Sequence, residues 1–190
     1  IMKVCFFSPT AYGYFSPGNS EWAGGAEVQQ VLIARELKKL GFDVSFIVGD
    51  FGQGEVEIHD GITVIRSFAP FRGNRKLRFV PDMLKIYRAM RIADADVYNQ
   101  RSTSFFTGQL SWFASRMRRA FTFSLGIDYN CYADCRGRIP RPIQFLYGYG
   151  VSRADAVIAQ TVRQQVLLRE NMGLDSTLIR NGIVVDVEPG

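Results

Sequence analysis

The sequence predicts an α/β domain built on a doubly wound parallel sheet, and three observations support this fold class. Short apolar runs of β-forming residues alternate along the chain with helical segments of about 12 residues, the pattern of right-handed βαβ units. The first run is apolar at nearly every position, as in strands buried on both faces. The chain has 190 residues, 47% of them hydrophobic, which suffices for the core of one such domain.

The elements follow one another in a regular order. We expect strands over residues 3–8, 44–48, 62–68, 96–99, 120–125, 156–159 and 176–179. We expect helices over residues 26–40, 81–92, 105–117, 142–152 and 162–171. Gly41 and Gly173 stand where a left-handed residue ends a helix, and Pro81 suits the first turn of the second helix. The remaining segments, 52–61, 70–78 and 127–141, are expected to be polar or basic loops.

Charge is distributed unevenly along a chain whose formal net charge is +5. Residues 66–141 hold 15 Lys and Arg against 5 Asp and Glu, and many aromatic residues lie among them. Such a block suits an anionic membrane surface or a lipid-diphosphate acceptor, and a solvated basic face is the equal alternative. We assign membrane or acceptor contact to Arg72, Arg75, Lys76 and Arg78. Without a recognition motif, we expect no nucleic-acid partner.

Cysteine and histidine offer little chemistry. Three cysteines are too few for a disulfide scaffold; Cys5 is expected in the core, and Cys131 and Cys135 lack the further ligands of a zinc site. We therefore predict free thiols and no bound metal. The only histidine, His59, is expected in an exposed loop. No apolar run approaches the roughly 20 residues of a membrane span, and no secretory signal is visible, so we expect a cytoplasmic protein.

The loop before the first helix is the first candidate site. In a parallel sheet of this kind, ligands bind at the carboxyl ends of the strands, near the point where the strand order reverses. Gly24 and Gly25 precede the helix, whose unpaired N–H groups favour an anion such as a phosphate. A glycine turn that only lets the helix pack is the alternative. The motifs of dinucleotide-binding enzymes, P-loop enzymes, protein kinases and G-x-S-x-G hydrolases are absent.

Several segments, taken in order, resemble a known family. They are KVCFF (3–7), GGAE (24–27), LKKLGFDV (37–44), DVYNQR (96–101), FSLGID (123–128), ADAVIAQT (154–161) and IRNGI (179–183). Together they resemble the N-terminal, Rossmann-like domain of GT-B glycosyltransferases, most closely the retaining family-4 group. The resemblance implies that residues 1–190 form one acceptor-side domain, and that a C-terminal domain, which binds the nucleotide-sugar and carries a pair of glutamates, lies outside this chain.

The resemblance also implies a site. Gly24, Gly25 and Glu27 would face the donor diphosphate and the acceptor, and Asn181 and Gly182 would lie at the cleft. Substrate contacts are also expected from two strand ends, at Arg101 and Asp128. Many family members have a histidine near Asp128; here the sequence reads LGID (125–128), so that role is not carried over. Glu27 has a helix-capping role as its alternative, and the Asn-Gly pair a plain turn.

The resemblance thus implies an enzyme. The full-length protein would be a retaining, hexosyl-type glycosyltransferase that moves a sugar from a nucleotide-diphosphate sugar to a glycan or lipid-linked acceptor in cell-envelope polysaccharide synthesis. It would need no metal cofactor, and these 190 residues would be inactive by themselves. A peripheral position on the inner face of the membrane fits the basic block. The alternative is a non-catalytic Rossmann-like module that binds an anionic surface or a partner domain.

Overall fold

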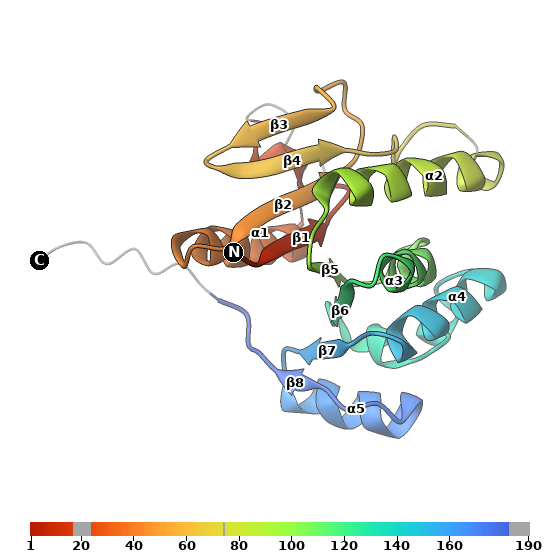
Figure 1. The fold of residues 1–190 in the computed structure, drawn as a ribbon. Coiled ribbons are helices and arrows are strands. Elements are labelled where there is room, and N and C mark those ends of the chain that lie inside the picture. The colour runs from red at the N-terminus through yellow and green to blue at the C-terminus, as the bar shows by residue number, and fades with distance from the viewer. Residues whose placement is uncertain (17–23, 74, 183–190) are drawn as a thin grey trace, which may run out of the picture.

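A computed structural model describes residues 1–16, 24–73 and 75–182, with the backbone alone at 75–77. Its eight strands form one sheet in the order β3-β4-β2-β1-β5-β6-β7-β8, and all neighbours are parallel except β3 and β4 (Figure 1). The strands are β1 (Lys3–Phe7), β2 (Asp43–Val48), β3 (Val56–His59), β4 (Ile62–Arg66), β5 (Val97–Arg101), β6 (Ala120–Ser124), β7 (Ala156–Ala159) and β8 (Thr177–Leu178). The predicted fold class is confirmed.

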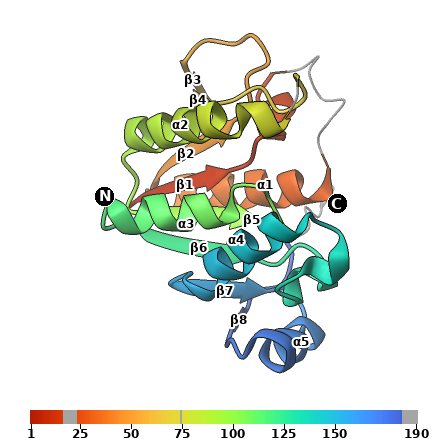
Figure 2. The same cartoon turned by 90° about the vertical axis from the view of Figure 1, so that its right-hand side faces the viewer.

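Five α-helices cover the sheet. They are α1 (Gly25–Lys39), α2 (Arg75–Ala93), α3 (Thr107–Arg116), α4 (Arg141–Ser152) and α5 (Val162–Met172). Helices α2, α3 and α4 lie side by side on one face, whereas α1 lies on the other (Figures 1 and 2). Two buried clusters match these layers, because the side chains of α1 pack with one cluster and those of the other four helices with the second.

Strand order reverses between β1 and β5. From β1 the chain proceeds outward through β2 and β4, then crosses back to β5 and continues outward on the other side. Loops that leave the carboxyl ends of β1 and β5 therefore diverge and open a crevice between them. The sequence predicts two helix ends well: Gly41 has a φ of 87°, and Gly173 ends α5 with a φ of 67°.

Two segments differ from the prediction. Residues 52–61, expected as a loop, contain β3, which pairs antiparallel with β4. His59 therefore lies on an edge strand rather than in a loop. Within β3, Glu57 accepts hydrogen bonds from Tyr12 and from the ring of His59. Helix α2 begins at Arg75 and carries Pro81 in its interior. A proline inside a helix removes one N–H donor, and its ring crowds the carbonyl four residues before it. The packing of α2 on the sheet offsets this cost.

Helices α3 and α4 approach each other closely through glycine. A Cβ on Gly108 would lie 2.5 Å from the carbonyl oxygen of Leu146, and one on Gly150 would lie 2.7 Å from that of Thr107. Backbone therefore touches backbone at this crossing, where no larger side chain fits. None of the helices built by the described residues is both long and apolar enough to span a bilayer.

Candidate functional site

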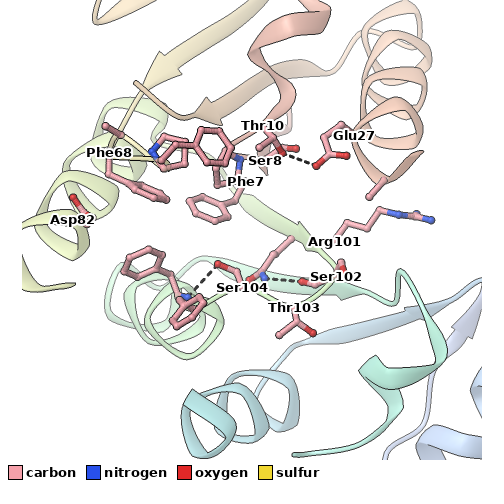
Figure 3. A pocket seen from close by; sticks show the side chains of 18 of the residues that line it. Phe7, Ser8, Thr10, Glu27, Phe68, Asp82, Arg101, Ser102, Thr103 and Ser104 are labelled. Carbon is pink, nitrogen blue, oxygen red and sulfur yellow. Dashed lines mark hydrogen bonds between the residues drawn. The ribbon is translucent and has the colours of Figure 1, made fainter. Parts of the chain in front are cut away.

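A cavity with a volume of about 610 Å³ lies at the crevice between β1 and β5 (Figure 3). Its walls come from the carboxyl ends of β1 and β5, the loop after β4, and the first turns of α1 and α2. The lining includes the Phe7–Thr10 segment, Ala26, Glu27, Gln30, the 68–73 loop, Arg78, Asp82 and the 100–106 segment. Aromatic rings and polar groups thus face one another across a cavity large enough for a sugar or a larger ligand.

Glu27 fastens the first loop to α1. Its carboxylate accepts a hydrogen bond from the Thr10 hydroxyl at 2.6 Å and another from the Gly24 N–H at 3.0 Å. The second bond supplies a partner for a backbone donor at the helix start, as in a capping box. Glu27 therefore combines the predicted capping role with a place in the cavity wall (Figure 3).

Arg101 is the principal cation at the end of β5. Its guanidinium donates to the Asn181 side chain at 2.9 Å, and its buried Nε has no hydrogen-bond partner among the described residues. Burial lowers the pKa of Arg101 from its usual value, while the nearby Glu27 acts in the opposite direction. An arginine remains charged under such a shift. A fixed positive charge with unused donor capacity is suited to an anionic or hydroxyl-rich ligand.

Arg78 is held inside the cavity wall. It donates to the Ala69 carbonyl at 2.9 Å, to the carbonyl of Arg72, and to the Asp82 carboxylate at 3.0 Å. The Asp82 side chain is only 4% exposed, so this ion pair stands largely out of water. Arg78 therefore shapes the 69–72 loop, whereas Arg72 stays exposed at the cavity rim. The side chains of Arg75 and Lys76, also predicted as contacts, lie outside the described residues.

Asp128 lies apart from this cavity. It follows β6 and forms an ion pair with Arg163 at 3.2 Å, in a separate hollow of about 490 Å³. Tyr129, Tyr132 and Arg136 also line that hollow. The structure thus does not bring Asp128 together with Glu27 and Arg101, because β6 is one strand further from the reversal point.

The segment after β8 returns to the carboxyl edge of the sheet. Asn181 accepts from Arg101 and donates to the Gln160 side chain at 2.6 Å, while the Gly182 carbonyl accepts from Gln29 of α1 at 2.9 Å. These bonds tie the ends of β5 and β7 and helix α1 to one short segment. Asn181 and Gly182 thus lie at the margin of the crevice, with Asn181 next to Arg101.

Gly24 and Gly25 form the exposed start of α1, beside the cavity-lining Ala26 and Glu27. The backbone N–H of Gly24 is taken by Glu27. A Cβ built on Gly25 meets no atom of the described residues within 4 Å. The helix start is therefore open to a ligand that approaches from the crevice.

Sequence reasoning overlooked part of the lining. Asp82, Gln30 and the 102–104 segment are polar residues whose place in the cavity becomes visible only in the folded chain. A signal existed for the 102–104 segment, because it directly follows a strand that ends next to β1. Asp82 and Gln30 lie inside helices and gave no such signal.

The described residues offer no obvious metal centre. No group of three or more His, Cys, Asp or Glu side chains that could hold a metal ion occurs in the part of the chain that the structure describes. All three cysteines are free and buried. Burial raises the pKa of the Cys5 thiol to about 12 and that of Cys131 to about 11.

We expect the folded protein to resist thiol reagents at neutral pH. The reactive species is the thiolate, which burial and raised pKa values disfavour for Cys5 and Cys131, and Cys135 shares the burial. Titration with a chromogenic disulfide should therefore detect these thiols slowly in buffer and completely in denaturant. Rapid modification of any of them in the native state would contradict this reading.

Solved structures share this fold at low sequence identity. Sucrose-phosphate synthase from Thermosynechococcus elongatus superposes with a TM-score of 0.69 at 14% identity, over 96% of this chain and 49% of its own. MurG from Acinetobacter baumannii gives 0.59 at 10% identity, over 97% and 47%. A putative UDP-N-acetylglucosamine 2-epimerase from Listeria monocytogenes gives 0.58 at 11%, over 89% and 42%. The chain thus spans about half the length of these proteins.

These likenesses establish the fold, and the sequence establishes the family. No curated protein sequence matches the chain at a significant level. The model of the family described as Glycosyltransferase Family 4 matches residues 23–187, which include the start of α1, the end of β5 and the Asn181 segment. The chain therefore belongs to Glycosyltransferase Family 4, and its sheet is that of a GT-B N-terminal domain, as the sequence predicts.

Proposed function

We propose that the full-length protein is a retaining, hexosyl-type glycosyltransferase for which this chain supplies the acceptor-side domain. The donor is a nucleotide-diphosphate sugar, and the acceptor is a glycan or a lipid-linked sugar of cell-envelope polysaccharide synthesis. A second domain outside this chain binds the nucleotide. Membership of Glycosyltransferase Family 4 supports glycosyl transfer as the activity. The donor and acceptor classes follow from the resemblance described above.

The observation that carries the proposal is the cavity between β1 and β5. It lies at the reversal point of the sheet, the position at which ligands bind in open α/β folds. The exposed ring of Phe71 is an apolar surface on which a sugar ring or a lipid stem can pack. The largely buried rings of Phe7, Phe68 and Phe106 form the apolar base of the cavity. Arg101 and Glu27 supply charged groups at the side that faces α1 (Figure 3).

The charged groups of this site suit a reaction in which this domain stabilises negative charge and does not supply a catalytic base. The start of α1 presents open backbone N–H groups, and Arg101 adds a fixed positive charge. The N–H groups favour the negative charge that develops on a departing diphosphate, and the arginine favours the anionic or hydroxyl groups of an acceptor. We therefore propose that the helix dipole stabilises the leaving group without a metal cofactor, while Arg101 binds the acceptor in the cavity.

Arg101→Gln tests the assignment in the full-length protein. We expect the KM for the acceptor to rise about 10- to 100-fold, because a charge-assisted hydrogen bond contributes about 1.5–3 kcal/mol. The affinity for the free nucleoside diphosphate should change little, since the second domain provides most of its binding. Release of nucleoside diphosphate at several acceptor concentrations measures the acceptor KM, and calorimetric titration with nucleoside diphosphate measures its affinity.

Arg163→Gln is the matched control, because Arg163 is an exposed arginine that pairs with Asp128 in the separate hollow. It should leave the acceptor KM unchanged, and thermal unfolding checks that both variants fold. Equal effects of the two substitutions would remove Arg101 from the acceptor site. Turnover by residues 1–190 alone would contradict their assignment as the acceptor-side half.

A further inference from the structure

The three helices on one face of the sheet are almost free of acidic residues. Helices α2, α3 and α4 contain eight Lys and Arg but a single acid, Asp82, which is buried against Arg78. Helix α1, on the opposite face, is nearly balanced, with three basic and two acidic residues. Eight of the 15 basic residues between positions 66 and 141 therefore lie on the helices of one side of the molecule.

Four of these eight cations are solvent-exposed and form no ion pair with a described residue. Lys85 and Arg91 of α2, Arg116 of α3 and Arg141 of α4 are all exposed. No carboxylate within residues 1–16, 24–73 and 75–182 forms an ion pair with any of these four side chains. Two other cations of α2 are paired, Arg88 with Glu55 at 2.6 Å and Arg78 with Asp82 at 3.0 Å. Four cations without partners favour an anionic surface.

Large apolar side chains lie among these cations. Val80 and Leu84, one turn apart on α2, are 57% and 59% exposed. Trp112 of α3 is 49% exposed and Phe145 of α4 is 75% exposed. We call these four residues, together with Lys85, Arg91, Arg116 and Arg141, the basic–aromatic face. Apolar side chains spread over three helices make a broad surface, unlike the single groove that a peptide would fill.

The three helices form one rigid surface. Helices α3 and α4 touch through Gly108 and Gly150, and α2 joins α3 through the rings of Tyr87 and Phe113, 4.8 Å apart. Figure 2 shows the three helices side by side in front of the sheet. Side chains that project from all three can therefore meet one extended partner at the same time.

We propose that the basic–aromatic face binds the surface of an anionic lipid bilayer. Lys and Arg near such a surface each contribute about 1 kcal/mol of attraction. Trp and Phe suit the boundary between headgroups and acyl chains, and the aliphatic stems of Arg and Lys lie against the same layer. No helix of the described residues is suited to crossing the bilayer, so the contact is peripheral. Arg72 and Arg78, at the cavity, are not part of this face.

The position of the face has a consequence for the acceptor, which rests on the proposed glycosyl transfer. Asp82 of α2, and Phe106 just before α3, line the cavity, so the first turns of these helices border both the cavity and the face. A lipid-linked acceptor that stays anchored in the bilayer could place its sugar in the cavity. The bilayer contact itself does not depend on the chemistry of transfer.

Vesicle co-sedimentation of the full-length protein tests the contact. We expect binding to vesicles of phosphatidylglycerol and phosphatidylcholine, little binding to pure phosphatidylcholine, and loss of binding at high salt. Arg116→Glu combined with Arg141→Glu should lower the apparent affinity at least about 30-fold, because two attractive charges become repulsive. Trp112→Ala combined with Phe145→Ala should weaken binding about tenfold with little change in salt dependence.

Arg35→Glu combined with Lys39→Glu makes the same charge change on the opposite face, where α1 carries both residues. This control should keep vesicle binding within about twofold of that of the wild-type protein. Equal losses in both double variants, or binding to neutral vesicles alone, would overturn the proposal. So would a dimer in solution that the face variants dissociate, because the face would then be a protein interface. Transfer to a water-soluble acceptor should stay unchanged in all these variants, so a failure of the glycosyltransferase assignment would be seen separately.

Discussion

Gly150→Ala is expected to destabilise the protein by about 3 kcal/mol or more in the free energy of unfolding. The new Cβ would lie 2.7 Å from the Thr107 carbonyl oxygen and 2.9 Å from the Cα of Gly108. Both atoms belong to the backbone of α3, so relief requires the helices to separate rather than a side chain to rotate. Overpacking a filled interior costs about 1–3 kcal/mol and more where backbone must move. The midpoint of urea unfolding measures the effect.

Gly148 provides a matched control in the same helix. Its Cβ would meet Ala133 at 3.5 Å, an ordinary van der Waals contact. Because alanine has the higher helix propensity, Gly148→Ala should be neutral or stabilising by up to about 1 kcal/mol. Gly108→Ala, whose Cβ would lie 2.5 Å from the Leu146 carbonyl, should resemble Gly150→Ala. A similar stability for all three variants would show that the α3–α4 crossing is looser than the structure has it.

Much of the fold was predictable because its local signals agree with its tertiary context. Buried parallel strands such as β1 read as continuous apolar runs, and Gly41 and Gly173 sit at helix ends in left-handed conformations that favour glycine. The edge strand β3 was missed because half of its residues are exposed and its flanks are rich in glycine. Strand β3 forms because it pairs with β4, whereas its own residues favour a strand only weakly.

The candidate site was predictable only at the ends of strands and at the start of α1. Arg101 follows directly from the order of the strands, and Glu27 from its place at the start of α1. Asp128, also expected to contact substrate, lies in the separate hollow, because β6 is one strand further from the reversal point. Arg78 was predicted to contact a membrane or the acceptor, and its ion pair with Asp82 and its bonds to the 69–72 loop make it part of the cavity wall.

Gly25→Val is expected to lower kcat/KM of the full-length enzyme about 100-fold while leaving its stability nearly unchanged. Gly25 opens α1 at the crevice, and within the described residues no atom lies within 4 Å of the added Cβ. The described part of the chain therefore leaves space for a side chain to begin at this position. A diphosphate or sugar that approaches the bare helix start would meet its methyl groups, and a displacement of about 1 Å of a reacting group costs roughly 100-fold in rate. Turnover and thermal unfolding, measured on the same preparation, separate the two effects.

The size of the side chain provides the internal control for this substitution. Gly25→Ala adds only the Cβ and should cost less activity than valine, while it gains about 0.5–1 kcal/mol of stability from a less flexible unfolded chain. A graded loss from glycine through alanine to valine, at constant or higher unfolding temperature, identifies a steric conflict with substrate. Full activity of Gly25→Val would place the substrate away from the start of α1. In that event Arg101 alone would remain as the anion-binding group at this side of the cavity, and the role of Gly24 and Gly25 would be to let α1 begin beside β1.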